Sequence, residues 1–98
     1  MTDASIINEI FLFVQYWRYL VKHFSISLRS FADVQAFVSL AMVQPFQVLV
    51  GSENQRINGK NFMGMFSLDY SHPLQVSVDC DETEFVKFRK AAAQFLVA

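Results

Sequence analysis

The stretch Phe24-Ser-Ile-Ser-Leu-Arg-Ser-Phe-Ala-Asp-Val-Gln-Ala-Phe-Val-Ser-Leu-Ala-Met42 changes its hydrophobic period at Ser30. Before Ser30, apolar and polar residues alternate, which predicts a half-buried strand whose inward side chains are Phe24, Ile26 and Leu28. After Ser30 the apolar residues follow helical spacing, at Val34, Phe37, Val38 and Ala41. The stretch therefore predicts a strand followed by a helix over residues 31–42, with Ser30 as its N-cap.

The rest of the chain continues this mixture of strands and helices. Further strands are predicted over residues 46–50, 55–58 and 74–78, and further helices over residues 62–68 and 82–96. Asn61 and Asp81 stand at N-cap positions. The order β-α-β-β-α-β-α favours an α+β fold, a four-stranded antiparallel sheet with helices on one face. The opposite face should be polar, because its side chains are Ser25, Ser27, Gln47, Gln75 and Ser77.

Residues 1–22 are predicted to form an extra N-terminal amphipathic helix, and residues 23–98 the α+β domain. This helix is apolar on more than one side, so it should be buried on more than one side. We expect its oligomer interface at Ile10, Phe13, Trp17 and Leu20. Three arrangements stay open: packing within the monomer, a homodimer in which this helix is shared or exchanged, and association with a membrane surface.

Composition excludes several classes of protein. Hydrophobic residues make up 53% and charged residues 17%, which is unlike a disordered chain. The net charge of −1 gives no electrostatic footprint for nucleic acid. The apolar stretch 6–21 is interrupted by Asn8, Glu9, Gln15 and Arg18, so we expect a cytoplasmic protein without membrane insertion. Eleven Phe exceed what one small core needs, so some should lie at a docking surface.

No constellation of residues indicates an enzyme, and none calls for a cofactor or a metal. One cysteine excludes an intramolecular disulfide and a cysteine-based zinc site. The three glycines cannot build a phosphate-binding loop. We interpret His23 as structural and His72 as a solvated loop residue. Cys80 should be an inert thiol, because the neighbouring Asp79 and Asp81 disfavour its thiolate.

The stretch Ile57-Asn-Gly-Lys-Asn-Phe-Met-Gly-Met-Phe-Ser-Leu68, within this order of elements, resembles the HPr family. HPr is the phosphocarrier of the bacterial phosphoenolpyruvate-dependent sugar phosphotransferase system. Its short helix starts with Lys-Ser-hydrophobic-Met-Gly and ends with Ser-Leu, a pattern matched by Lys60, Met63, Gly64, Ser67 and Leu68. The resemblance covers about residues 24–96 and implies the HPr-like open-faced β-sandwich.

The resemblance also implies two phosphorylation positions, and this sequence departs from the family at both. The family carries its phosphoryl group on a His at the start of the first helix, and counting back without gaps places Ser30 there. A serine phosphate is too stable to serve as a relay, and Asp33 would put negative charge where a phosphate should bind. The family's regulatory Ser, which caps the short helix, is replaced by Asn61. We therefore expect a degenerate member that lacks the active-site His.

The feature of the family that this sequence retains is a docking surface. Family members contact partner proteins through apolar residues of the short helix, matched here by Phe62, Met63 and Phe66, and Phe31 would extend the patch. This predicts a regulatory or docking module that binds a phosphotransferase-system component or a regulator. Two alternatives stay open. One is an active phosphocarrier that uses a non-standard residue, such as Ser30 or His23, and the other is a homodimeric structural or interaction protein that shares only the fold.

Overall fold

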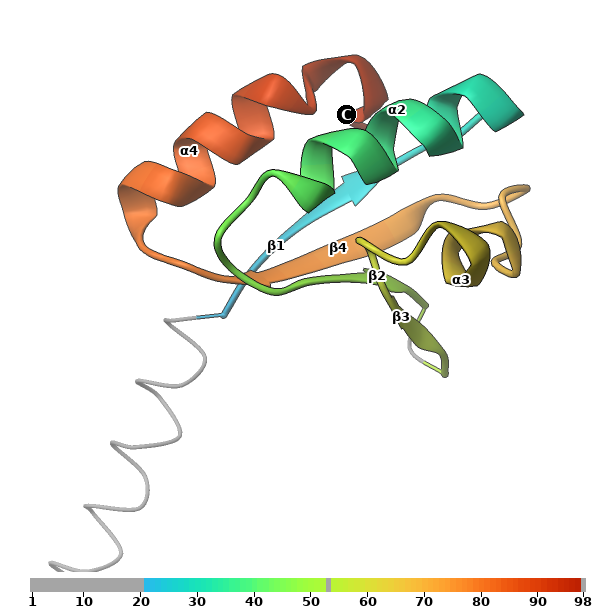
Figure 1. Ribbon diagram of the computed structural model, residues 1–98, viewed down its shortest axis with the longest axis horizontal. Helices are drawn as coiled ribbons and strands as arrows, with labels where there is room; N and C mark the ends of the chain where they lie inside the picture. The colour runs from blue at the N-terminus through green and yellow to red at the C-terminus, as the bar shows by residue number, and fades with distance from the viewer. Residues whose placement is uncertain (1–20, 53, 98) are drawn as a thin grey trace, which may run out of the picture.

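The computed structural model describes residues 21–52 and 54–97. Its elements, in chain order, are β1 (Val21–Ile26), α2 (Phe31–Met42), β2 (Val48–Gly51), β3 (Arg56–Asn58), α3 (Phe62–Phe66), β4 (Leu74–Asp79), α4 (Glu82–Ala91) and the 3-10 turn η1 (Ala93–Phe95). The strands form one antiparallel sheet in the order β1-β4-β2-β3. Helices α2 and α4 lie over the same face of this sheet (Figure 1). The predicted α+β class and the bounds of α2 are confirmed.

The start of β1 corrects the predicted end of the N-terminal helix. Val21 and Lys22 were expected to be helical, but they belong to the strand, because they pair with Asp79 and Val78 of β4. β1 therefore crosses the predicted domain boundary between residues 22 and 23. The rest of the predicted N-terminal helix lies outside the described residues, as do its interface positions Ile10, Phe13, Trp17 and Leu20.

The C-terminal helix is shorter than predicted. α4 ends at Ala91 instead of continuing to residue 96, and η1 follows it. The backbone leaves the helix because it pairs with the edge of β1: Ser27 N donates to Phe95 O at 2.8 Å, and Val97 N donates to Ser25 O at 3.1 Å. Leu96 is thereby bridged to Ile26. Helical spacing cannot reveal this competing partner for the last turn.

The core lies between the sheet and the helices and is rich in phenylalanine. The Phe88 ring of α4 contacts Phe24 of β1, Phe37 of α2 and Phe46 before β2, with centroids 5.5–6.2 Å apart. Phe37 also meets Phe95 edge-on at 5.8 Å. Such ring pairs add about 0.5–1.5 kcal/mol each to the stabilisation from apolar burial. Five of the eleven Phe are buried in this core: Phe24, Phe37, Phe46, Phe88 and Phe95.

The other face of the sheet is mostly polar, as predicted, but one of its serines is buried. Ser25, Gln47 and Gln75 are exposed there, but Ser77 is 5% exposed and therefore buried. Ser77 lies in the central strand β4, directly between His23 of β1 and Leu49 of β2. Its hydroxyl is 3.0 Å from His23 Nδ1. The side chains on the two neighbouring strands thus cover Ser77, which the alternation of apolar and polar residues had predicted to be exposed to solvent.

The turn between β2 and β3 imposes a steric requirement for glycine at position 51. Ser52 N donates to Gln55 O at 2.9 Å, and a Cβ on Gly51 would lie 1.9 Å from the same oxygen. We expect Gly51→Ala to lower the free energy of unfolding by at least about 2 kcal/mol, because the clash is with backbone. Urea denaturation followed by circular dichroism measures this. Ser52→Ala is the matched control and should be near neutral. Equal midpoints for both variants would contradict this steric account.

Candidate docking surface

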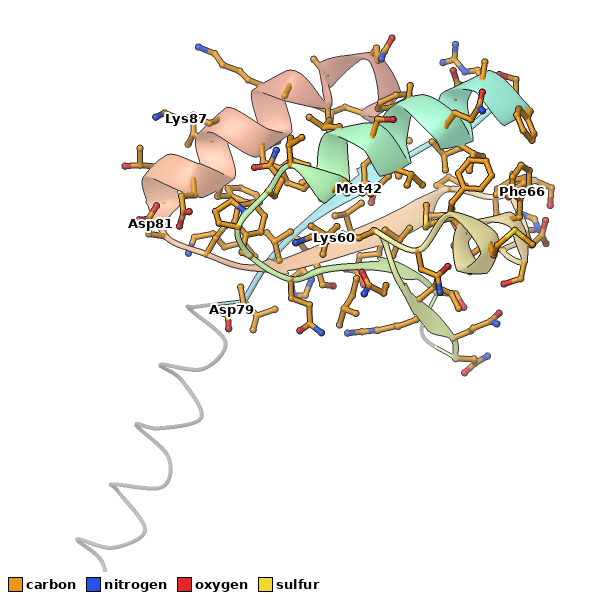
Figure 2. All side chains as sticks on the ribbon, viewed as in Figure 1. Met42, Lys60, Phe66, Asp79, Asp81 and Lys87 are labelled. Atoms are coloured by element: carbon orange, nitrogen blue, oxygen red, sulfur yellow. The ribbon has the colours of Figure 1, made fainter. Side chains whose placement is uncertain are left out.

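Three phenylalanine rings meet on the surface where α2 begins beside α3. The Phe31 centroid lies 5.9 Å from that of Phe62 and 4.7 Å from that of Phe66, and Phe62 and Phe66 are 4.8 Å apart. Phe31 is 56% exposed, and the neighbouring Met63 is 75% exposed. Figure 2 shows Phe66 at the α3 end of the molecule. We call Phe31, Phe62, Met63 and Phe66 the aromatic patch. The structure brings all four predicted docking residues to one region.

The N-caps of α2 and α3 determine where the rings of Phe31 and Phe62 lie. Ser30 begins α2, so Phe31 occupies its first helical position, and Asn61 begins α3, so Phe62 does the same there. Phe62 and Phe66 are four residues apart, which puts them on one side of the short helix. Phe62 packs against the core and Phe66 is half-buried, whereas Phe31 and Met63 are more exposed. The patch is therefore apolar, preformed and accessible.

The N-terminus of α2 is already occupied by groups of the chain itself. Ser30 Oγ accepts from Asp33 N at 3.2 Å, and Asp33 Oδ2 accepts from Arg29 N at 2.9 Å. Ser30 is thus confirmed as the N-cap, and Asp33 lies in the first turn of α2, as expected. A helix N-terminus attracts anions through its free N–H groups and its dipole, and an aspartate in the first turn opposes a second negative charge.

The N-terminus of α3 is closed in a similar way. Asn61 Oδ1 accepts from Gly64 N at 3.1 Å, which confirms Asn61 as the N-cap. Gly64 lies close to β3, since a Cβ there would be 2.7 Å from Ile57 Cγ2. The Met-Gly pair of the motif thus lets α3 pack tightly on the sheet while Met63 points outward.

Lys60 has a structural role that its motif position did not indicate. Its Nζ donates to Gln44 O at 2.7 Å, just past the C-terminus of α2. Gln44 Nε2 in turn donates to Leu40 O at 3.1 Å, inside the last turn of α2. Lys60 therefore ties the start of α3 to the end of α2, where an ammonium group also complements the helix dipole. Figure 2 shows Lys60 beside the end of α2 marked by Met42.

Neither histidine lies at the start of a helix. His23 is in β1 on the polar face of the sheet and contacts Ser77, which agrees with a structural role. His72 is in the exposed loop between α3 and β4, with Nε2 4.0 Å from Asp69 Oδ2. Hydrogen bonds from Ser71 hold the pKa of Asp69 below its usual value. These surroundings agree with a solvated loop histidine.

Cys80 has the character expected of an unreactive thiol. It is buried, and burial is the main cause that raises the pKa of its thiol. The carboxylates of Glu84, Asp81 and Asp79 act in the same direction, and the Lys22 ammonium opposes them. Burial therefore raises this pKa more than the two aspartates that the sequence places beside Cys80. A protonated thiol is a poor nucleophile, so Cys80 is not a candidate reactive group.

The structure also contains a shallow hollow that the sequence did not predict. It has a volume of about 170 Å³ and lies on the polar face of the sheet, lined by Val21, Gln47, Leu49, Arg56, Ser77, Val78 and Asp79. In residues 21–52 and 54–97, no group of three or more His, Cys, Asp or Glu side chains is placed to hold a metal ion. Within the same ranges, no helix has the length and apolar character needed to cross a membrane.

Comparison with solved structures finds similar folds, one of which is described here. No protein-family model matches this chain, and no curated protein matches it. The crystal structure of HPr-C-His from Thermoanaerobacter tengcongensis is similar, with 25% sequence identity and a TM-score of 0.60. The similarity covers 74% of this chain and 88% of that chain. The fold of this chain is therefore HPr-like, as its sequence resemblance implied.

The capping role of Ser30 can be measured directly. We expect Ser30→Ala to lower the free energy of unfolding by about 1 kcal/mol, because Asp33 N would lose its acceptor. Ser30→Asp should keep most of the stability, since aspartate also caps helices well. Ser39→Ala, on the exposed side of α2, is the control and should be neutral or slightly stabilising. Chemical denaturation of the three variants tests this, and an unaffected Ser30→Ala protein would refute the cap.

Proposed function

We propose that this chain is an HPr-like protein related to the phosphoenolpyruvate-dependent sugar phosphotransferase system, and that it acts as a protein-docking module instead of a phosphocarrier. The observation that carries the proposal is the aromatic patch. Its three rings contact one another at centroid distances of 4.7–5.9 Å, and Met63 stands 75% exposed beside them.

The chemistry of the patch suits recognition of a protein surface. Exposed apolar side chains that cluster, instead of lying singly, are typical of interaction sites. The mutual ring contacts hold Phe31, Phe62 and Phe66 in place before binding, so little side-chain freedom is left to lose. Met63 adds a flexible, polarisable contact that adapts to a partner. In protein interfaces a few residues, often aromatic, contribute most of the binding energy. The three rings of the patch are suited to this role.

The residues at the start of α2 argue against a phosphocarrier function. A phosphoryl relay needs an imidazole, because its phosphoramidate is labile enough to pass the group on. Residues 29–33 read Arg-Ser-Phe-Ala-Asp and contain no histidine. Ser30 and Asp33 also take up backbone N–H groups at this helix start, and the Asp33 carboxylate repels an incoming phosphate.

The connection to the phosphotransferase system rests on two independent similarities. One is the sequence pattern Lys60, Met63, Gly64, Ser67 and Leu68, at the positions where the HPr family has its short-helix motif. The other is the fold shared with the HPr-C-His structure. Since HPr proteins dock to other components of that system, we propose such a component, or a regulator of it, as the partner.

Phosphoryl transfer is tested by intact-mass spectrometry after incubation with phosphoenolpyruvate and enzyme I. We expect no mass gain for this chain, because no imidazole lies at the start of α2, while an authentic HPr in the same reaction becomes fully labelled. A gain of one phosphoryl group would refute the non-carrier function. It would direct the search to an acid-labile site, with His23 and Ser30 examined first.

Docking is tested by titration calorimetry with enzyme I as the probe. Met63→Asp should weaken binding at least about tenfold, since a carboxylate would be desolvated in an apolar contact. Met42→Asp is the matched control, because Met42 is 62% exposed at the opposite end of α2. We expect the control to bind as the unmodified chain does. Equal losses in both variants, or no binding by the unmodified chain, would count against this docking function.

A further inference from the structure

Helices α2 and α4 cover the same face of the sheet but differ in charge (Figure 1). Five of the ten residues of α4 are ionisable: Glu82, Glu84, Lys87, Arg89 and Lys90. Of the twelve residues of α2 only Asp33 is ionisable, and its carboxylate accepts a hydrogen bond from Arg29 N. A helix on the surface of a domain normally has charged and polar residues on the side away from the core. The outer side of α2 lacks the charges that such a helix usually presents to water.

That outer side is apolar at both of its ends. Phe31 at the start of α2 is 56% exposed, Met42 at its end is 62% exposed, and Val43, its C-cap, is 75% exposed. The exposed residues between these ends are uncharged: Ala32, Gln35, Ala36 and Ser39. We call the exposed side of residues 31–43 the α2 face. Exposed apolar side chains that form a contiguous surface are typical of a site of interaction.

The aromatic patch accounts for only one end of the α2 face. Phe31 contacts Phe62 and Phe66 of α3, with centroids 5.9 and 4.7 Å apart. Met42 lies eleven residues further along the helix, which at 1.5 Å per residue is roughly 16 Å away. A partner that binds α3 therefore leaves the far end of the α2 face without an explanation.

The charge of the α2 face favours a second copy of this chain as its partner. In a contact between two copies related by a twofold axis, the same surface lies on both sides. A charged side chain near that axis would lie close to its own equivalent and be repelled by it. Partners of different sequence are commonly selected by complementary charges, and the α2 face offers such a partner only Asp33 at its border.

The order of side chains along the α2 face fits an antiparallel pair. Phe31 and Met42 are separated by about three helical turns, so they lie on the same side of α2 at its opposite ends. In an antiparallel pair, Phe31 of each copy meets Met42 of the other copy, a contact between sulfur and an aromatic ring that is favourable. Ala36 then lies opposite Ser39 of the other copy near the middle of the pair.

The extent of the α2 face sets the strength of this contact. The twelve residues of α2 form a helix roughly 18 Å long. A contact along one such helix is smaller than the standard interface of roughly 800 Å² per partner, and it belongs to the weak specific class below roughly 1,200 Å² in total. The expected dimer therefore dissociates on dilution.

We infer that the α2 face binds the α2 face of a second copy of this chain in antiparallel orientation, which gives a weak homodimer. The dimer covers Phe31, whereas Phe62, Met63 and Phe66 belong to α3 and lie outside the α2 face. At the dilution of a binding titration the pair is dissociated, so the Met42→Asp control of the docking test is unaffected. The inference stands independently of the docking function, because its tests use no other protein.

Sedimentation velocity of the full chain over a wide range of concentrations measures this association. The unmodified chain should change from monomer to dimer as its concentration rises. Ala36→Glu places a carboxylate near the middle of the pair and should give a monomer over the whole range. Ala91→Glu makes the same change at an exposed residue of α4 and should associate as the unmodified chain does. Circular dichroism should report the same fold for all three proteins, because both alanines are exposed.

Three results of this measurement would overturn the inference. One is an unmodified chain that stays monomeric at every concentration. Another is an Ala36→Glu protein that associates as well as the unmodified chain, since another part of the chain would then hold the dimer. The third is an equal loss of association in Ala36→Glu and Ala91→Glu, which would indicate a general effect of charge.

Cross-linking tests the same contact without a change of charge. Ser39→Cys places a thiol on the α2 face, and a short bismaleimide should link it to the same residue of the second copy. The natural Cys80 is buried and contributes little background. Ala91→Cys, on the exposed side of α4, is the matched control and should remain unlinked. Absence of linked dimer for Ser39→Cys, or equal linking of both variants, would overturn the inference even if Ala36→Glu failed to fold.

Discussion

The Phe88 ring is the contact on which the rest of this structure depends. It projects from α4 and meets Phe24 of β1, Phe37 of α2 and Phe46 of the loop before β2. One side chain therefore joins four segments that are distant in the sequence. Because aromatic rings pack in preferred tilted or edge-on geometries, the contacts restrict the relative angles of the helices as well as their distance from the sheet. With α2 held in this way, its first residue reaches the surface beside α3.

The candidate docking surface follows from where two helices begin. Ser30 and Asn61 end the preceding extended backbone and start α2 and α3, and each cap is followed directly by a phenylalanine. Lys60 then ties the start of α3 to the end of α2 through the carbonyl of Gln44. A shift of either helix by one residue would rotate its first side chain by about 100° and separate the rings. The caps thus decide both local structure and surface chemistry.

The same caps limit what chemistry the helix starts can perform. One backbone N–H in each helix start has an acceptor within the chain: Asp33 N is bound by Ser30, and Gly64 N is bound by Asn61. Each of these donors stabilises its helix start and is occupied by that internal acceptor instead of a ligand. In the proposed docking module, the polar residues at these helix starts contribute to stability, and the aromatic patch is the surface proposed for recognition.

The sequence by itself determined the order of elements, the three helix caps and the bounds of α2, because each depends on local periodicity or on a side chain within three residues of its partner. The residues of the aromatic patch were expected from the resemblance of the short helix to the HPr family, and the contacts of Phe31 with Phe62 and Phe66 depend on how α2 packs beside α3. The tertiary structure decided the rest. β1 begins at Val21 and α4 ends at Ala91 because β4 and the edge of β1 supply distant backbone partners that outweigh helical spacing. Ser77 is buried and Lys60 binds Gln44 through contacts 54 and 16 residues apart in the chain. Contacts between distant residues produce no periodic pattern in the sequence. The entropic cost of bringing such residues together is offset by the stability of the whole fold and not by either residue alone.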